Sequence, residues 1–180
     1  MSNTLKIGII LGSTREGRVS PQVGEWVLDY SKKTEEADFE LLDIKTYDLP
    51  FFGTSKDATN VDKWKAKLNE LDGFIFVVAE YNHSMTGVLK NALDSAYDEW
   101  NNKAAAIVSY GSGGGIRATE HLRNSLSELQ VAHVRAHVQL SLFTDFENWK
   151  TFKPQDLHKK NMDTMMSQLI SWTKAMKSIR

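Results

Sequence analysis

Three short segments of the chain combine glycine with hydroxyl, guanidinium, amide or aromatic side chains, which are groups that bind a ligand better than they fill a core. They are residues 12–20 (GSTREGRVS), residues 80–87 (EYNHSMTG) and residues 110–115 (YGSGGG). Each segment follows an apolar run typical of a buried β-strand. The chain has no cysteine, which excludes disulfides, thiolate nucleophiles and iron–sulfur clusters. Redox chemistry would therefore need a bound cofactor.

The first segment has the composition of a phosphate-binding loop. Ser13, Thr14 and Ser20 supply hydroxyls, and Arg15 and Arg18 supply guanidinium groups. The proline that follows favours the start of a helix, so backbone N–H groups aligned with a helix dipole would face a bound anion. An arginine can add a bidentate contact. A polar turn whose serine merely caps the helix has the same composition, and this segment alone does not decide between the two.

Two widespread phosphate motifs are missing from this segment. Gly12 and Gly17 have the spacing of a P-loop, but Arg18 and Val19 stand where the lysine and the magnesium-binding hydroxyl are needed. The three-glycine dinucleotide fingerprint is absent because residues 13–15 are Ser, Thr and Arg. The sequence therefore argues against a nucleoside triphosphatase and against a Rossmann site after this strand.

The second and third segments suit a flat, hydrogen-bonding ring. Tyr81 can cover a ring face, while Asn82 and backbone amides reach the ring's polar edge. The glycines at 113–115 let the backbone approach a ligand closely. An exposed loop tyrosine, a turn-forming asparagine and a flexible glycine turn without a ligand are the ordinary alternatives.

The elements that position these segments alternate between strands and helices. Strands are predicted at residues 7–11, 39–44, 73–79, 104–109 and within 132–142, and a helix with apolar residues at three- and four-residue spacing follows each. Leu157 and Trp172 are predicted among the apolar positions of the last helix. This alternation predicts a doubly wound α/β sheet with right-handed crossovers, in which ligands bind at the carboxyl ends of the strands.

Composition bounds the kind of protein. A length of 180 residues with 41% hydrophobic and 25% charged content predicts one domain over residues 1–180. The formal net charge of -1 argues against nucleic-acid or membrane partners, and leaves small molecules or further copies of the chain. The apolar run near the N-terminus is too short for a signal peptide or a membrane span, so we expect a cytoplasmic protein.

At the three segments the chain resembles the NADPH-dependent FMN reductase family, a flavodoxin-like group that includes flavin, quinone, azo-dye and chromate reductases. The resemblance covers most of the chain and rests on three motifs in order. They are GSTR at 12–15 with Arg18 and Ser20, EYNHS at 80–84 running into GVLKNALD at 87–94, and SYG at 109–111 with Gly114, Gly115, Arg117 and Ala118. It implies a five-stranded parallel sheet of order 2-1-3-4-5 with helices on both faces.

The resemblance also implies a cofactor-binding set drawn from all three segments. Ser13, Arg15 and Ser20, with Arg18 and Val19 nearby, are expected to hold the FMN phosphate; Glu80, Tyr81, Asn82 and His83 to border the isoalloxazine; Ser109 and Gly111 to approach the ring; and Gly114 and Arg117 to lie near NADPH or NADH. No catalytic side chain and no metal site are expected, because the flavin carries the chemistry.

The implied activity is hydride transfer from NADPH or NADH to bound FMN and on to a small acceptor: a flavin, quinone, azo compound or metal oxyanion. Family members are commonly homodimers or homotetramers. Two alternatives remain open, a flavodoxin-type electron carrier and a flavin-free regulatory or binding domain on the same fold.

A few residues depart from the family pattern or lie outside it. The family usually has proline where this chain has Ala79 and Thr86, so the loop between them is expected to be less rigid. His121 and His158 are predicted to lie on or near helices without partners.

Overall fold

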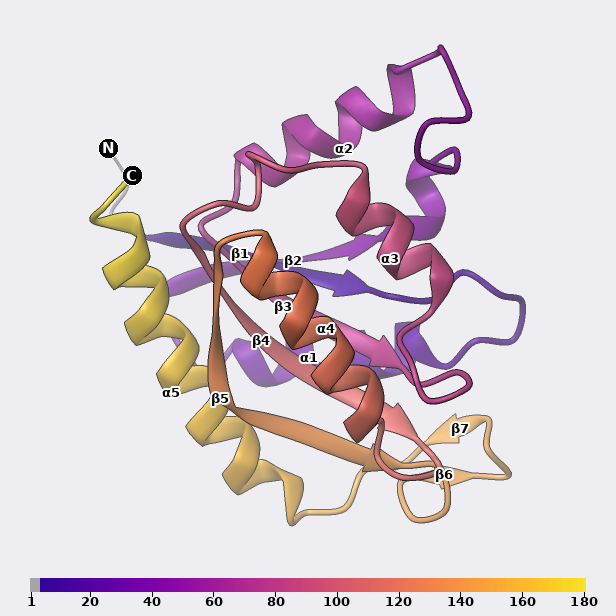
Figure 1. The fold of residues 1–180 in the computed structure, drawn as a ribbon. Coiled ribbons are helices and arrows are strands. Elements are labelled where there is room, and N and C mark those ends of the chain that lie inside the picture. The colour runs from indigo at the N-terminus through magenta and orange to yellow at the C-terminus, as the bar shows by residue number, and fades with distance from the viewer. Residues whose placement is uncertain (1–3) are drawn as a thin grey trace.

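A five-stranded parallel sheet forms the centre of the molecule in the computed structural model, which describes residues 4–180 (Figure 1). The strands are β1 (Leu5–Leu11), β2 (Ala37–Asp43), β3 (Gly73–Ala79), β4 (Lys103–Gly111) and β5 (Val131–Ser141). Their spatial order is β2-β1-β3-β4-β5, and every neighbouring pair in this sheet is parallel. The predicted doubly wound sheet and its order 2-1-3-4-5 are confirmed.

Helices cover both faces of the sheet. One face carries α1 (Ser20–Ser31) and α5 (His158–Lys177), and the other carries α2 (Thr59–Asn69), α3 (Gly87–Asp94) and α4 (Ile116–Glu128). A short 3-10 helix, η1 (Ile44–Tyr47), follows β2. Within residues 4–180, no helix has the length and apolar character needed to cross a membrane.

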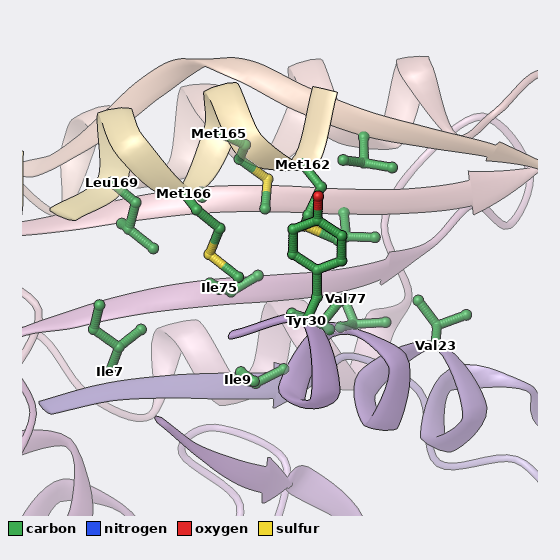
Figure 2. Close-up of a cluster of buried hydrophobic side chains, with 14 of the residues drawn as sticks. Ile7, Ile9, Val23, Tyr30, Ile75, Val77, Met162, Met165, Met166 and Leu169 are labelled. Atoms are coloured by element: carbon green, nitrogen blue, oxygen red, sulfur yellow. The ribbon is translucent and has the colours of Figure 1, made fainter. Parts of the chain in front are cut away.

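The continuous apolar runs of β1 and β3 supply both cores, because successive side chains of a strand point to opposite faces. Ile9 and Ile75 belong to the cluster under α1 and α5, whereas Ile10 and Phe76 belong to the cluster under the other three helices. Figure 2 shows the first cluster, in which the methionines of α5 pack onto isoleucines of the sheet opposite Tyr30 of α1.

The C-terminal third of the chain differs from the prediction in two places. A two-stranded antiparallel hairpin, β6 (Phe146–Glu147) with β7 (Thr151–Phe152), lies between β5 and α5, where no strand is predicted, and Phe152 packs edge-on against Trp26 of α1 with ring centroids 5.5 Å apart. Leu157 and Trp172 are not core residues, since they are 59% and 46% exposed. Leu157 precedes the first turn of α5, and Trp172 lines an open cavity together with residues of the edge strand β5 and of α4.

The edge strand β5 contains an irregularity that the sequence does not signal. Its register against β4 shifts between Ala105 and Ile107. Arg123 of α4 binds the backbone at this shift: its guanidinium donates to the carbonyl oxygens of Val134 and Arg135, both at 3.1 Å. The bulge therefore keeps its backbone acceptors satisfied.

Candidate functional site

The three predicted ligand segments meet at the carboxyl-terminal edge of the sheet. Parallel strands in register end at the same edge, and backbone bonds join the segments there: Gly12 N donates to Val77 O at 3.0 Å and Glu80 N to Tyr110 O at 2.9 Å. A cavity of about 300 Å³ opens between the first two segments, the start of α3 and the loop that carries Phe51. Its walls are Ser13, Thr14, Arg15, Phe51, Tyr81, Thr86, Gly87 and Val88.

Ser13, Arg15 and Tyr81 are brought together at this cavity. The Tyr81 hydroxyl accepts a hydrogen bond from Arg15 Nε at 2.8 Å and lies 3.3 Å from Ser13 Oγ. Arg15 Nη1 donates to the carbonyl of Glu16 at 3.0 Å, and the Arg15 side chain is otherwise exposed. Its guanidinium therefore retains donors that face the solvent side of the loop.

Arg18 has a different environment from Arg15. Its Nη1 donates to Asp43 Oδ1 at 2.8 Å, its Nη2 pairs with the other carboxylate oxygen, and Nη1 also bonds the carbonyl of Ser13. The Arg18 side chain is only 12% exposed. Arg18 thus joins the first loop to the end of β2, and both Nη atoms of its guanidinium already bond the Asp43 carboxylate. Sequence reasoning missed Asp43, which lies 25 positions away.

Hydroxyl groups gather beneath the first loop, where α1 begins. Ser20 is fully buried, and its Oγ has no hydrogen-bond partner within residues 4–180. Val19, in the N-cap position of α1, is buried and offers no side-chain cap. Tyr110 lies close by: burial raises the pKa of its phenol and the Tyr81 phenol adds to the rise, whereas the nearby hydroxyls of Ser20 and Ser13 and the charge of Arg15 lower it. The Ser20 hydroxyl approaches the phenol but does not meet hydrogen-bond geometry. Tyr110 therefore stays protonated as a donor, and only its place in the family motif pointed to it.

The second segment forms a tight reverse turn. Tyr81 and Ser84 exchange backbone hydrogen bonds at 2.9 and 3.0 Å, and the two central residues, Asn82 and His83, have φ of 48° and 67°. Positive φ at both central positions is the type I′ pattern. Asn82 and His83 lie exposed at its tip. The turn is attached to α4, because His121 Nδ1 lies 2.9 Å from Ser84 Oγ.

The prediction that two histidines lack partners is wrong. His121 contacts the turn as described, and the buried His158 bonds Asp145 through Nε2 at 2.8 Å. Asp145 also accepts from the backbone N–H of Ser141 and Gln155, so the pair fastens the start of α5 to the end of β5. Partners that lie on other elements cannot be read from helical spacing.

Glu80 and Arg117 pair with each other at the start of α4. The Glu80 carboxylate accepts from Arg117 Nε at 2.7 Å and from the backbone N–H of Arg117 and Ala118 at 3.1 and 3.3 Å. Burial alone would raise the pKa of Glu80, but the bonds from Arg117 and Ala118 outweigh it and lower that pKa. An ionised carboxylate at a helix N-terminus is stabilised by the helix dipole. The pair joins the second segment to α4.

The third segment is a compact glycine turn. The buried Ser109 hydroxyl donates to the carbonyl of Gly114 at 2.6 Å, and Gly114 N donates to Gly111 O at 3.1 Å. Gly114 and Gly115 have φ of 71° and 75°, in the left-handed region that favours glycine. Ser109 therefore supports, with its hydroxyl, the turn that follows the carboxyl end of β4.

Thr86, at a position where the family usually has proline, makes two hydrogen bonds with its hydroxyl. Its hydroxyl accepts from Leu89 N at 3.1 Å as the N-cap of α3, and donates to the carbonyl of Gly12 at 2.6 Å. Thr86 is buried. A single side chain thus links the second segment to the first, a cross-loop contact that proline cannot make.

These features define a class of protein. A parallel sheet of order 2-1-3-4-5 with a polar loop, a tight turn and a glycine turn at the carboxyl ends of β1, β3 and β4 is the flavodoxin-like arrangement. The fold resembles that of the flavoenzyme NAD(P)H:acceptor oxidoreductase FerB of Paracoccus denitrificans, with a TM-score of 0.78 at 19% identity over 96% of this chain and 98% of that one.

The sequence comparisons identify the family. The model of the NADPH-dependent FMN reductase family matches residues 5–145, and the chain belongs to that family. It is 35% identical over 156 residues to the NAD(P)H-dependent FMN reductase ntnL of Nectria, with 78% of each chain covered. It is 32% identical over 137 residues to a 2-hydroxy-1,4-benzoquinone reductase of Burkholderia, covering 71% of this chain and 73% of that one. The protein is an oxidoreductase that uses FMN and NAD(P)H.

The residues at the sheet edge fit FMN. A buried hydroxyl without a partner costs about 1–3 kcal/mol, and the Ser20 hydroxyl lies in this state at the N-terminus of α1, where a phosphate would accept from it. Arg15 adds a cationic side chain on the exposed side of the same loop. These donors would suit a phosphate, and a cavity lined by aromatic residues adjoins them.

Proposed function

We propose that this protein is a quinone-type reductase, in which hydride from NAD(P)H passes through FMN to a small planar acceptor. The observation that carries the proposal is the cavity at the sheet edge, where the phosphate-type loop and two aromatic side chains, Tyr81 and Phe51, border one space. The likeness to a 2-hydroxy-1,4-benzoquinone reductase supports the choice of acceptor class.

In this proposal the phosphate of FMN lies against Ser13, Arg15 and Ser20. The Arg18 pair with Asp43 keeps that loop closed, and Val19 positions the helix start. These roles agree with the unpartnered Ser20 hydroxyl and the exposed Arg15 fork. Bidentate contact from an arginine gives a phosphate both charge and direction.

The remaining predicted contacts surround the ring. We assign the backbone of Tyr81, Asn82 and His83 to its polar edge, and Ser109, Gly111 and Gly114 to the turn beneath it. Glu80 holds this turn to α4 through Arg117, whose side chain is 41% exposed and turns its remaining donors toward an incoming nicotinamide nucleotide. Bound FMN supplies the redox chemistry, and these groups bind, orient and exclude water.

We further propose that residues 1–180 form one FMN-binding domain of a cytoplasmic homodimer or homotetramer with small-molecule partners only. The absence of cysteine agrees with a reducing compartment. Exposed aromatic residues at the site edge, Phe51 and Tyr81, agree with a second copy closing over that edge.

The flavin spectrum tests the central claim. Purified protein, loaded with FMN if necessary, is mixed anaerobically with NADPH and with NADH while the flavin absorbance is followed. Prompt bleaching, followed by recovery on addition of a benzoquinone, is expected. Bound flavin that ignores both nucleotides would instead indicate an electron carrier, and protein that takes up no FMN would indicate a flavin-free domain.

A further inference from the structure

The loop between η1 and α2 brings an aromatic side chain to the mouth of the site cavity. Phe51 and Phe52 are both 70% exposed, yet their surroundings differ. Phe51 lines the site cavity together with residues of the first loop and Tyr81. Phe52 lines a separate cavity of about 250 Å³ against α2, to which Phe51 also contributes, and is not among the residues that line the site cavity. The two neighbours therefore form a natural matched pair.

The backbone on both sides of Phe51 is fixed by one side chain of α3. Asn91 Oδ1 accepts from the N–H of Phe52 at 2.8 Å, and Asn91 Nδ2 donates to the carbonyl of Pro50 at 2.9 Å. Thr54 completes the turn, since its N–H and hydroxyl donate to the carbonyl of Phe51 at 2.9 and 2.7 Å. The exposed ring of Phe51 therefore stands on a well-defined backbone.

Asn91 also couples the loop to the site. It belongs to α3, whose first residues Gly87 and Val88 line the same cavity as Phe51. A second cavity of about 300 Å³ adjoins the first, because Thr14 and Val88 line both, and Asn91 lies on its wall. The helix that forms one side of the cavity thus holds the aromatic side chain on its rim.

A single exposed phenylalanine needs no explanation, whereas one that stands on a fixed backbone and lines a cavity with another aromatic residue does. Tyr81, 39% exposed, borders the cavity from the second segment, and Phe51 borders it from the loop after η1. Ser13 and Arg15, which are assigned to FMN, form the polar part of the cavity wall. The aromatic side chains of Phe51 and Tyr81 are therefore left to contact the electron acceptor. Two aromatic walls suit a flat ring better than a compact ion.

We propose that Phe51, positioned by Asn91, determines acceptor specificity by contacting a planar aromatic acceptor of the quinone class. The inference rests on the proposed function. One hydride from NAD(P)H and one proton from solvent convert the quinone to a hydroquinone, and NAD(P)H is oxidised to NAD(P)⁺. Phe51 contributes contact area and ring orientation, and takes no part in proton or electron transfer.

The test compares Phe51→Ala with Phe52→Ala, and adds Phe51→Trp and Asn91→Ala. Each variant is measured for FMN affinity by fluorescence titration, for flavin bleaching by NADPH, and for kcat/KM with a benzoquinone and with ferricyanide. Loss of one aromatic contact predicts a fall of about 5-fold in kcat/KM for the quinone in Phe51→Ala. Ferricyanide turnover, FMN affinity and bleaching should stay at the wild-type level.

The other variants sharpen the result. Phe52→Ala should behave as wild type, Phe51→Trp should keep quinone turnover, and Asn91→Ala should reproduce part of the loss without touching the ring itself. Equal losses for quinone and ferricyanide, a loss confined to FMN affinity, or equal effects of Phe51→Ala and Phe52→Ala would each overturn the inference. Wild-type protein without flavin bleaching would instead refute the proposed function.

Discussion

The two arginines of the first loop should respond differently to substitution. Arg15 is exposed and donates one hydrogen bond to the Tyr81 hydroxyl and one to the carbonyl of Glu16. The Arg18 side chain is only 12% exposed and forms an ion pair with Asp43. The changes to make are Arg15→Met and Arg18→Met, which keep the side-chain length and remove the charge. We expect the first to weaken FMN binding and the second chiefly to weaken the fold.

The structure sets the size of each effect. Hydrogen bonds from a charged group are worth about 1.5–3 kcal/mol, so Arg15→Met should raise the Kd for FMN by about 10- to 100-fold. Arg18 and Asp43 form a half-buried pair, for which loss of one partner costs roughly 1–2 kcal/mol, between the surface and buried cases. That cost corresponds to a fall of about 4 °C in Tm for a chain of this length.

Two measurements separate the effects. Fluorescence titration gives the Kd for FMN, and thermal unfolding without added flavin gives Tm. Arg135→Met is the matched control, because Arg135 lies exposed on β5 away from the site. A larger loss of FMN affinity in Arg18→Met than in Arg15→Met, with both variants folded, would refute this division of roles.

Two further predictions concern stability. Burial, with Arg180 nearby, lowers the pKa of Lys103 from 10.5 to about 8, so the unfolded state binds more protons between those values and stability should rise with pH across that window. Lys103→Met should flatten this pH dependence of the free energy of unfolding, measured by urea unfolding at several pH values, and should raise that free energy by roughly 1–3 kcal/mol near pH 7. An unchanged pH dependence would contradict this. Thr86→Val removes the cap of α3 and the bond to Gly12, which should cost about 2 kcal/mol, whereas Thr86→Ser should unfold as wild type does in the same assay.

Much of the architecture follows from local patterns. The unbroken apolar runs at β1 and β3 predict strands covered on both faces, and helical spacing predicts the crossovers between them. Because parallel strands end together, the same patterns also predict that the segments after β1, β3 and β4 meet at one edge. Periodicity does not predict the hairpin β6–β7, because its strands are only two residues long. It does not predict the exposure of Trp172 either, since that depends on which elements lie beside α5.

The sequence by itself determined the alternating strands and helices of a doubly wound sheet and the residue types that follow each strand, and its resemblance to the FMN reductase family implied the strand order. Only the tertiary structure decided which polar group each of those residues contacts: Arg18 meets Asp43 across 25 positions, Glu80 meets Arg117 across 37, and Asn91 meets the backbone beside Phe51 across 39. Such partners come together through strand order and helix placement. A motif records which groups are present, and the fold determines which remain free to bind a ligand.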